Sequence, residues 1–174
     1  MPPEIRESEV AANWDRNSAV WADHVRAGWD IFRAHWNNPA FLEFVGDLSG
    51  KTVLDAGCGE GTNTRIFAGR GARITGADLS GKMLELARAE EAREPLGIRY
   101  EHASFTDMAI FGAESFETVI STMALMDGPD FPGAMREIAR EVPVTSAIAS
   151  TGEHATVTSS RVTSTSMRRG PWLA

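Results

Sequence analysis

The sequence predicts an α/β fold with a doubly wound, mainly parallel sheet, and three observations support this prediction. Strand-like and helix-like patterns alternate from residue 52 onward. A glycine-rich turn over residues 57–61 joins the first strand to the helix that follows it. An acidic residue, Asp78, ends the next strand. Alternating strands and helices build right-handed βαβ units, and these units form a parallel sheet.

Residues 1–50 are predicted to form an N-terminal helical cap on this sheet. The charged residues 1–12 are expected to fray, and a helical stripe is expected over 14–36. The large apolar side chains of this stripe recur at steps of three or four residues: Trp21, Val25, Trp29, Phe32 and Trp36. We expect Trp29 and Trp36 to pack the cap onto the sheet. Asn38-Pro39 then predicts the start of a second helix, which Gly46 ends.

Residues 51–141 are predicted to form the α/β core within the same domain. Its strands are expected at 52–55, 73–78, 98–102 and 116–121. Its helices are expected at 62–69, 80–93 and 131–141. Ser80 is suited to cap the second of these helices, because a serine hydroxyl can accept a hydrogen bond from a free N–H of the first turn.

The composition changes at the C-terminal segment, residues 142–174, where 12 of 33 residues are Ser or Thr. Val144–Ser150 is expected to pair as a thin fifth strand, with 151–174 mobile or held only by edge pairing or by a partner. The sheet is therefore predicted to be curtailed or atypical on this side. Its open edge offers a route to a homo-oligomer.

Composition limits the partners. The chain has 174 residues and a net charge of −7, without a basic patch, which disfavours nucleic acid as a substrate. Its one cysteine is typical of a reducing cytoplasm. The sequence shows no signal-type segment and no apolar run near the roughly 18 residues that span a bilayer. We therefore expect a cytoplasmic protein with a small-molecule substrate and no membrane partner.

The glycine-rich turn is the strongest functional signal. Its residues follow the pattern D-x-G-x-G-x-G, in the order Asp55, Gly57, Gly59 and Gly61. Glycines leave the backbone open to a ligand, and the next helix points its free N–H groups at the same place. A dinucleotide fingerprint would need a glycine where Thr62 stands. A carboxylate that ends the second strand, as Asp78 does, is placed to accept hydrogen bonds from both ribose hydroxyls of a nucleoside.

These motifs resemble the class I S-adenosylmethionine-dependent methyltransferases, a family with a Rossmann-like fold, over residues 14–141. In that family the glycine loop holds the methionine part of the cofactor, and the acidic residue after the second strand binds the ribose. Residues 103–108 fall at the adenine-contacting loop, where Ser104 replaces the frequent aspartate. Trp14 and Trp21 lie in a segment that closes over the cofactor in many small-molecule members. The resemblance assigns cofactor contacts to Trp14, Trp21, Asp55, Gly57, Cys58, Gly59, Gly61, Asp78, Leu79, Ser104 and Phe105.

No catalytic residue stands out from the sequence. His24 lies one helical step from Trp21 and is a weak candidate for a general base. The histidines show no metal spacing with cysteine or carboxylate partners, so no metal site is predicted. A base is needed only where the acceptor loses a proton late in the reaction.

We therefore predict methyl transfer from S-adenosylmethionine to a small molecule. One alternative is a non-catalytic S-adenosylmethionine-binding or interaction protein with an incomplete acceptor site, which the atypical C-terminal segment favours. A Rossmann-like domain that binds another nucleotide, or none, is a further alternative. An NAD-dependent oxidoreductase is disfavoured by Thr62.

Overall fold

A computed structural model describes residues 5–141, 147–151 and 155–158 of the chain. Its strands form one sheet in the order β3-β2-β1-β4-β5-β6. The strands are β1 Thr52–Ala56, β2 Arg73–Asp78, β3 Arg99–His102, β4 Thr118–Thr122, β5 Ala147–Thr151 and β6 Ala155–Thr158. Neighbouring strands are parallel except for the β5–β6 pair, which is antiparallel. The predicted α/β fold with a mainly parallel sheet is confirmed.

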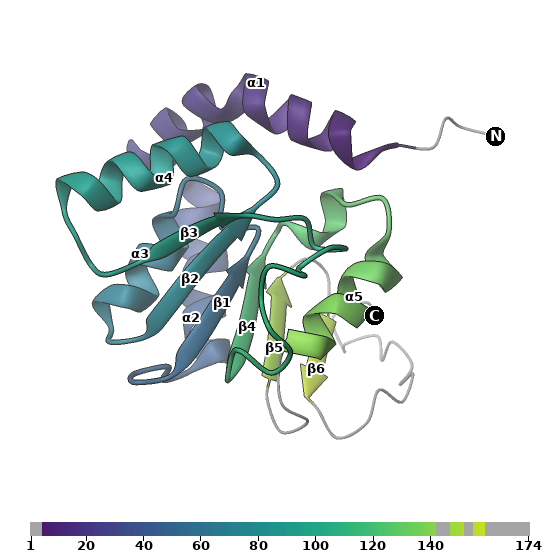
Figure 1. Ribbon diagram of the computed structural model, residues 1–174. Coiled ribbons are helices and arrows are strands. Elements are labelled where there is room, and N and C mark those ends of the chain that lie inside the picture. Colours follow the sequence, from purple (N-terminus) through teal and green to yellow (C-terminus); the bar gives the residue numbers. More distant parts are fainter. Residues whose placement is uncertain (1–4, 142–146, 152–154, 159–174) are drawn as a thin grey trace, which may run out of the picture.

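Helices cover both faces of this sheet (Figure 1). They are α1 Glu7–Arg26, α2 Asn38–Val45, α3 Thr62–Gly69, α4 Gly81–Arg93 and α5 Phe131–Glu141, with a π-helical turn at Arg33–Asn37 and a 3-10 turn at Leu125–Asp127. Because side chains alternate along a strand, Val53 packs with α2, α3 and α4, whereas Leu54 packs with α5 on the opposite face. Both side chains are fully buried.

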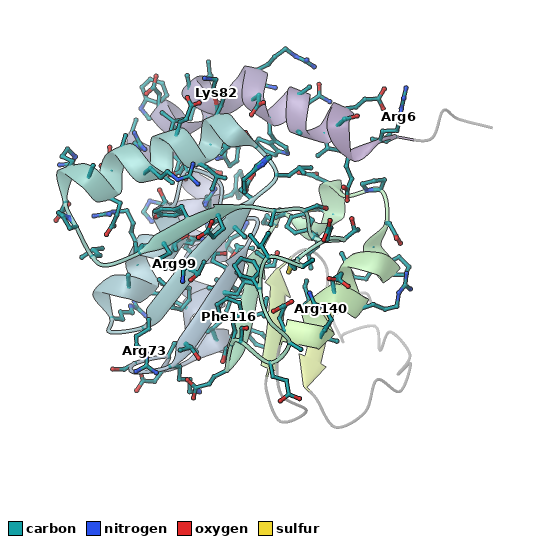
Figure 2. All side chains as sticks on the ribbon, viewed as in Figure 1. Arg6, Arg73, Lys82, Arg99, Phe116 and Arg140 are labelled. Carbon is teal, nitrogen blue, oxygen red and sulfur yellow. The ribbon has the colours of Figure 1, made fainter. Side chains whose placement is uncertain are left out.

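The helix α1 lies along α4, as Figure 1 shows. The Asp15 carboxylate of α1 accepts hydrogen bonds from the Ser80 hydroxyl at 2.6 Å and from the Lys82 backbone N–H at 3.1 Å. These bonds, led by the one from Ser80, lower the pKa of Asp15. Ser80 also caps α4, because its Oγ accepts from the Met83 N–H at 3.1 Å. Lys82 is labelled in Figure 2 at this crossing.

The cap differs from its prediction in two ways. The first helix begins at Glu7, so the prediction of a frayed segment through residue 12 is wrong for 7–12. The stripe expected over 14–36 is broken after Arg26, because Gly28 takes a left-handed φ of +71° that ends the helix.

The chain then turns outward, and the predicted packing of two tryptophans is wrong. Trp29 is 68% exposed and Trp36 is 71% exposed. The second helix, α2, does begin at Asn38 and does end before Gly46, as predicted.

The fifth strand is present beside β4, with Val119 opposite Ile148 and Thr122 opposite Thr151. Its described part runs from Ala147 to Thr151, and the predicted start at Val144 lies outside the described residues. β6 pairs with the far side of β5. The rest of the prediction for 151–174 lies mostly outside the described residues. Across the part of the chain that is described, no helix is long and apolar enough to cross a bilayer.

Candidate active site

The glycine loop follows β1 and leads into α3. Gly57, Gly59 and Gly61 all have positive φ angles. A Cβ at Gly57 would stand 2.3 Å from the Ala124 Cβ, and a Cβ at Gly61 would stand 2.5 Å from the Tyr100 hydroxyl oxygen. A Cβ at Gly59 would meet no atom within 4 Å. Two of the glycines are therefore required by packing, and Gly59 faces open space that a ligand can fill.

Asp78 is joined to this loop at the carboxyl end of β2. Its Oδ2 accepts the Gly59 N–H at 2.8 Å, and its Oδ1 accepts the Ser80 N–H at 2.8 Å. Burial raises the pKa of Asp78, and these two hydrogen bonds oppose the rise. Each carboxylate oxygen keeps a second lone pair. Asp78 can therefore accept further hydrogen bonds from a ligand while it holds the loop in place.

Asp55 has a different position from Asp78. It is 2% exposed, and its Oδ2 accepts a hydrogen bond from the Thr64 hydroxyl at 2.7 Å. Burial raises its pKa from 3.8 to about 6, although the bond from Thr64 lowers it. Asp55 does not line the cavity described next. Its observed contact fixes the start of α3 against β1.

A cavity of about 370 Å³ lies at the carboxyl ends of β1, β2 and β4. It extends from Gly57–Glu60 to Asp78, and its other walls come from α1, from the turn at Arg33–Asn37 and from residues 122–129. Met123 lines it with a left-handed φ of +58°, a strained conformation for a residue that is not glycine. Such strain clusters at functional sites. Ligands of open α/β sheets bind at this edge.

The charge of the cavity lining is mainly negative. Five carboxylates line it: Glu7, Asp30, Glu60, Asp78 and Asp127. Glu60 is 2% exposed, and its Oε2 accepts a hydrogen bond from the Thr62 hydroxyl at 2.7 Å. The other oxygen, Oε1, is buried without a hydrogen-bond partner in the structure. A buried carboxylate oxygen with no partner is costly, so this site is suited to a ligand that brings a donor or a positive charge.

Arg33 is the one lysine or arginine among the described residues that line this cavity. It starts the π-helical turn, and its guanidinium carbon lies 5.5 Å from the centre of the Trp21 ring. Its Nε is buried and has no hydrogen-bond partner in the structure. The arrangement offers one positively charged donor for an anionic group among several carboxylates that suit cationic groups.

The structure brings most of the predicted site residues together around this cavity. Those that line it are Trp14, Trp21, Gly57, Cys58, Gly59, Asp78, Leu79 and Phe105. The Trp14 and Trp21 rings meet edge to face, with centroids 5.4 Å apart. Burial raises the pKa of the Cys58 thiol, which disfavours a thiolate nucleophile at this position.

Four predicted residues do not line this cavity: His24, Asp55, Gly61 and Ser104. The Ser104 hydroxyl donates to Glu7 Oε1 at 2.7 Å and so ties its loop to α1. The His24 ring packs edge to face on Trp29, with centroids 5.1 Å apart.

Glu60 and Arg33 were not predicted as site residues. Glu60 occupies a variable position of the glycine pattern, where an acidic residue is the only signal. Arg33 lies in a stretch that reads as an ordinary helix, so its sequence gives no signal for a site.

The sheet order, the glycine loop and the acidic end of β2 define a Rossmann-like α/β domain. A family model described as "Methyltransferase domain" matches residues 53–142, about half of the chain. The chain belongs to this family, the class I S-adenosylmethionine-dependent methyltransferases.

Individual relatives agree with this assignment. The chain is 35% identical over 136 residues to the ubiquinone biosynthesis O-methyltransferase of Nitrosococcus oceani, covering 74% of this chain and 57% of that protein. The solved S-adenosylmethionine-dependent methyltransferase of Mesorhizobium loti is 31% identical, with a TM-score of 0.60 over 67% of this chain and 52% of that one.

The [4+2]-cyclase SpnF has a TM-score of 0.71 at 19% identity, covering 85% of this chain and 60% of that one, and this likeness shows the fold alone. The chain thus spans less than two thirds of the length of each of these relatives.

Proposed function

We propose that this chain transfers a methyl group from S-adenosylmethionine to a small molecule. The observation that carries the proposal is the cavity at the glycine loop, with several carboxylates and a single arginine around it. The cofactor has a sulfonium and an ammonium group, which suit the carboxylates, and one carboxylate, which suits Arg33. Family membership supports the same cofactor.

Each part of the cavity has a role in this proposal. Asp78 would accept hydrogen bonds from the ribose hydroxyls, and the backbone at Gly57 and Gly59 would hold the methionine part. Glu60 Oε1 is an acceptor for the ammonium group, because it is buried without a partner. Leu79 and Phe105 would supply apolar walls for the adenine. The Trp14–Trp21 pair, which lines the same cavity, would exclude water from it.

The bound cofactor supplies an already activated methyl group. The residues of this chain then need chiefly to hold the acceptor in line with that group, about 3 Å away, because orientation supplies much of the rate in such displacements. The Nitrosococcus oceani relative is named as an O-methyltransferase, and this supports a hydroxyl acceptor. The single cysteine, buried Cys58, supports a cytoplasmic setting.

Thermal unfolding with added ligand tests the proposal. S-adenosylhomocysteine should stabilise the chain by roughly 2.7 kcal/mol at a hundredfold excess over its Kd, because it binds the folded state. NAD should leave the melting temperature unchanged. Stabilisation by NAD and not by S-adenosylhomocysteine would contradict the proposal.

The second candidate is a protein that binds the cofactor without turnover, and the atypical composition of residues 142–174, with 12 Ser or Thr among 33 residues, favours it. It is separated from the enzyme by assaying S-adenosylhomocysteine release from S-adenosylmethionine with a pool of phenolic acceptors. Binding without any release above the rate in the absence of protein would favour the non-catalytic candidate.

A further inference from the structure

Residues 31–45 form one continuous helical stretch, in which the π-helical turn runs directly into α2. Four residues recur along it at steps of four: Phe32, Trp36, Ala40 and Phe44. A step of four is close to the roughly 3.6 residues of an α-helical turn, and a π-helical turn is slightly wider, so these residues lie along one face. We call this face the outer stripe, because all four residues are exposed.

The outer stripe offers a large aromatic surface. Phe32 is 75% exposed, Trp36 is 71% exposed and Phe44 is 51% exposed. The opposite face of the same stretch turns inward, where Phe41 is buried in the core and Arg33 lines the cofactor cavity. A whole aromatic side chain has about 150–250 Å² of surface, so the three exposed rings present roughly 400 Å². A standard interface covers about 800 Å² per partner, a little over half of it apolar, so the stripe supplies most of the apolar area that one copy of a dimer needs.

The outer stripe is complementary to itself when two copies meet antiparallel. Phe32 and Phe44 are its two ends, and Trp36 and Ala40 lie at equal distances on either side of its midpoint. A twofold axis through that midpoint sets Trp36 of each copy against Ala40 of the other, and Phe32 against Phe44. A large side chain then meets a small one in the middle, and aromatic rings meet at both ends. A symmetric dimer requires a surface of this kind.

The charged groups beside the stripe fit the same arrangement. His35 and Glu43 are exposed, and each directly precedes a residue of the stripe, so both lie on the same flank of it. In an antiparallel pair this flank meets its own copy, which places His35 of each copy near Glu43 of the other. An imidazole and a carboxylate attract each other across such a contact.

The charges of this stretch disfavour a lipid surface as the partner. Helices that lie on membranes carry lysine and arginine on their polar face. In residues 31–45 the only lysine or arginine is Arg33, which lines the cofactor cavity, and the whole chain has a net charge of −7. The observations therefore favour a second copy of the chain over a membrane.

We propose that the outer stripe is the contact surface of a homodimer of this chain, in which the two helical stretches pack antiparallel. This interface lies on the cap rather than at the sheet edge where the sequence predicts association. None of the four stripe residues lines the cofactor cavity, so the dimer is independent of the proposed function.

Analytical ultracentrifugation of the full chain tests the inference. Interfaces of standard size have Kd values from micromolar downward, so we expect the parent to sediment as a dimer at roughly 50 μM. Trp36→Glu should weaken the dimer at least tenfold, since it places a charge in the contact. Ile110→Glu is the matched control, because Ile110 is 58% exposed between β3 and β4, outside the stripe, and its Kd should stay within twofold of the parent. Ala40→Trp adds apolar surface but fills the place opposite Trp36, so it should also weaken the dimer at least tenfold.

A charge exchange tests the antiparallel arrangement. His35→Glu sets two carboxylates against each other and should weaken the dimer about threefold. Adding Glu43→Lys restores opposite charges and should return the Kd to within twofold of the parent. Circular dichroism spectra should be the same for all variants, since every changed residue is exposed.

Four outcomes would overturn the inference. The first is a parent that stays monomeric at this concentration, and co-sedimentation of that monomer with phosphatidylcholine vesicles would assign the stripe to a lipid surface instead. The second is an equal effect of Trp36→Glu and Ile110→Glu. The third is tighter association of Ala40→Trp, which would indicate non-specific apolar contact. The fourth is a double variant that stays as weak as His35→Glu.

Discussion

Replacing Asp55 by asparagine should change how the stability of the chain depends on pH. The pKa of this carboxyl is raised by burial from 3.8 to about 6, so the folded state holds its proton more firmly than the unfolded state does. Stability is therefore lost as the pH rises from about 4 to about 6, and it levels off above that. A rise of about two units corresponds to about 3 kcal/mol, at roughly 1.4 kcal/mol per unit. In Asp55→Asn the side chain stays neutral, and its oxygen can still accept the Thr64 hydroxyl.

Urea unfolding followed by circular dichroism between pH 4 and pH 8 measures this effect. The free energy of unfolding of Asp55→Asn, minus that of the parent, should rise by about 2.4 kcal/mol between pH 4 and pH 7, because the remainder of the effect lies below pH 4. Asp47→Asn is the control, because it removes the same carboxyl at an exposed position outside the core. Parallel curves for the parent and Asp55→Asn, or a difference that falls with pH, would refute the assignment of a buried carboxyl with a raised pKa.

Three further predictions follow from the loop, the cap and the cavity. Gly61→Ala should lower the free energy of unfolding by about 1–3 kcal/mol more than Gly59→Ala does, because only the change at Gly61 brings a Cβ against Tyr100. If urea unfolding showed a larger loss for Gly59→Ala, the packing role of Gly61 would be contradicted. Ser80→Ala should lower the free energy of unfolding by about 1–2 kcal/mol in the same assay, since it removes the cap of α4 and the hydrogen bond to Asp15 of α1. An unchanged urea midpoint of unfolding would exclude both roles of Ser80. Arg33→Met should weaken S-adenosylhomocysteine about tenfold or more while 5′-methylthioadenosine, which has no carboxylate, binds as before; equal weakening of both ligands would exclude a carboxylate contact.

The sequence predicts the sheet and the glycine loop well because local rules determine them. A buried strand followed by alternating glycines is compatible with few local structures other than a strand, a turn and a helix. An acidic residue at the end of the next parallel strand must then lie at the same carboxyl edge of the sheet as the glycines. The structure places Asp78 against the Gly59 N–H accordingly. Asp55 belongs to the same pattern, yet it bonds to Thr64 and does not line the cavity, because it pairs with Gly76, two residues before Asp78, and so lies deeper in the sheet than the edge where ligands bind.

The cap was harder to predict because a helical period does not show where a helix ends. Gly28 interrupts the apolar stripe, and the residues after it turn Trp29 and Trp36 outward. The same change of direction brings Arg33 into the cavity lining. A long-range contact of this kind depends on how α1 meets α4, through Asp15 and Ser80, and no local pattern encodes that crossing.

The most direct test of the central claim is a calorimetric titration of S-adenosylhomocysteine into the parent, Asp78→Ala and Glu85→Ala. Glu85 is a carboxylate on α4, outside the cavity and paired with Lys82, so its loss removes the same charge without touching the site. We expect the parent and Glu85→Ala to bind with equal Kd. Asp78→Ala should bind more weakly by roughly 1.5–3 kcal/mol, the scale of hydrogen bonds to a charged group. No binding to the parent, or equal binding to all three proteins with unchanged circular dichroism spectra, would contradict the central claim.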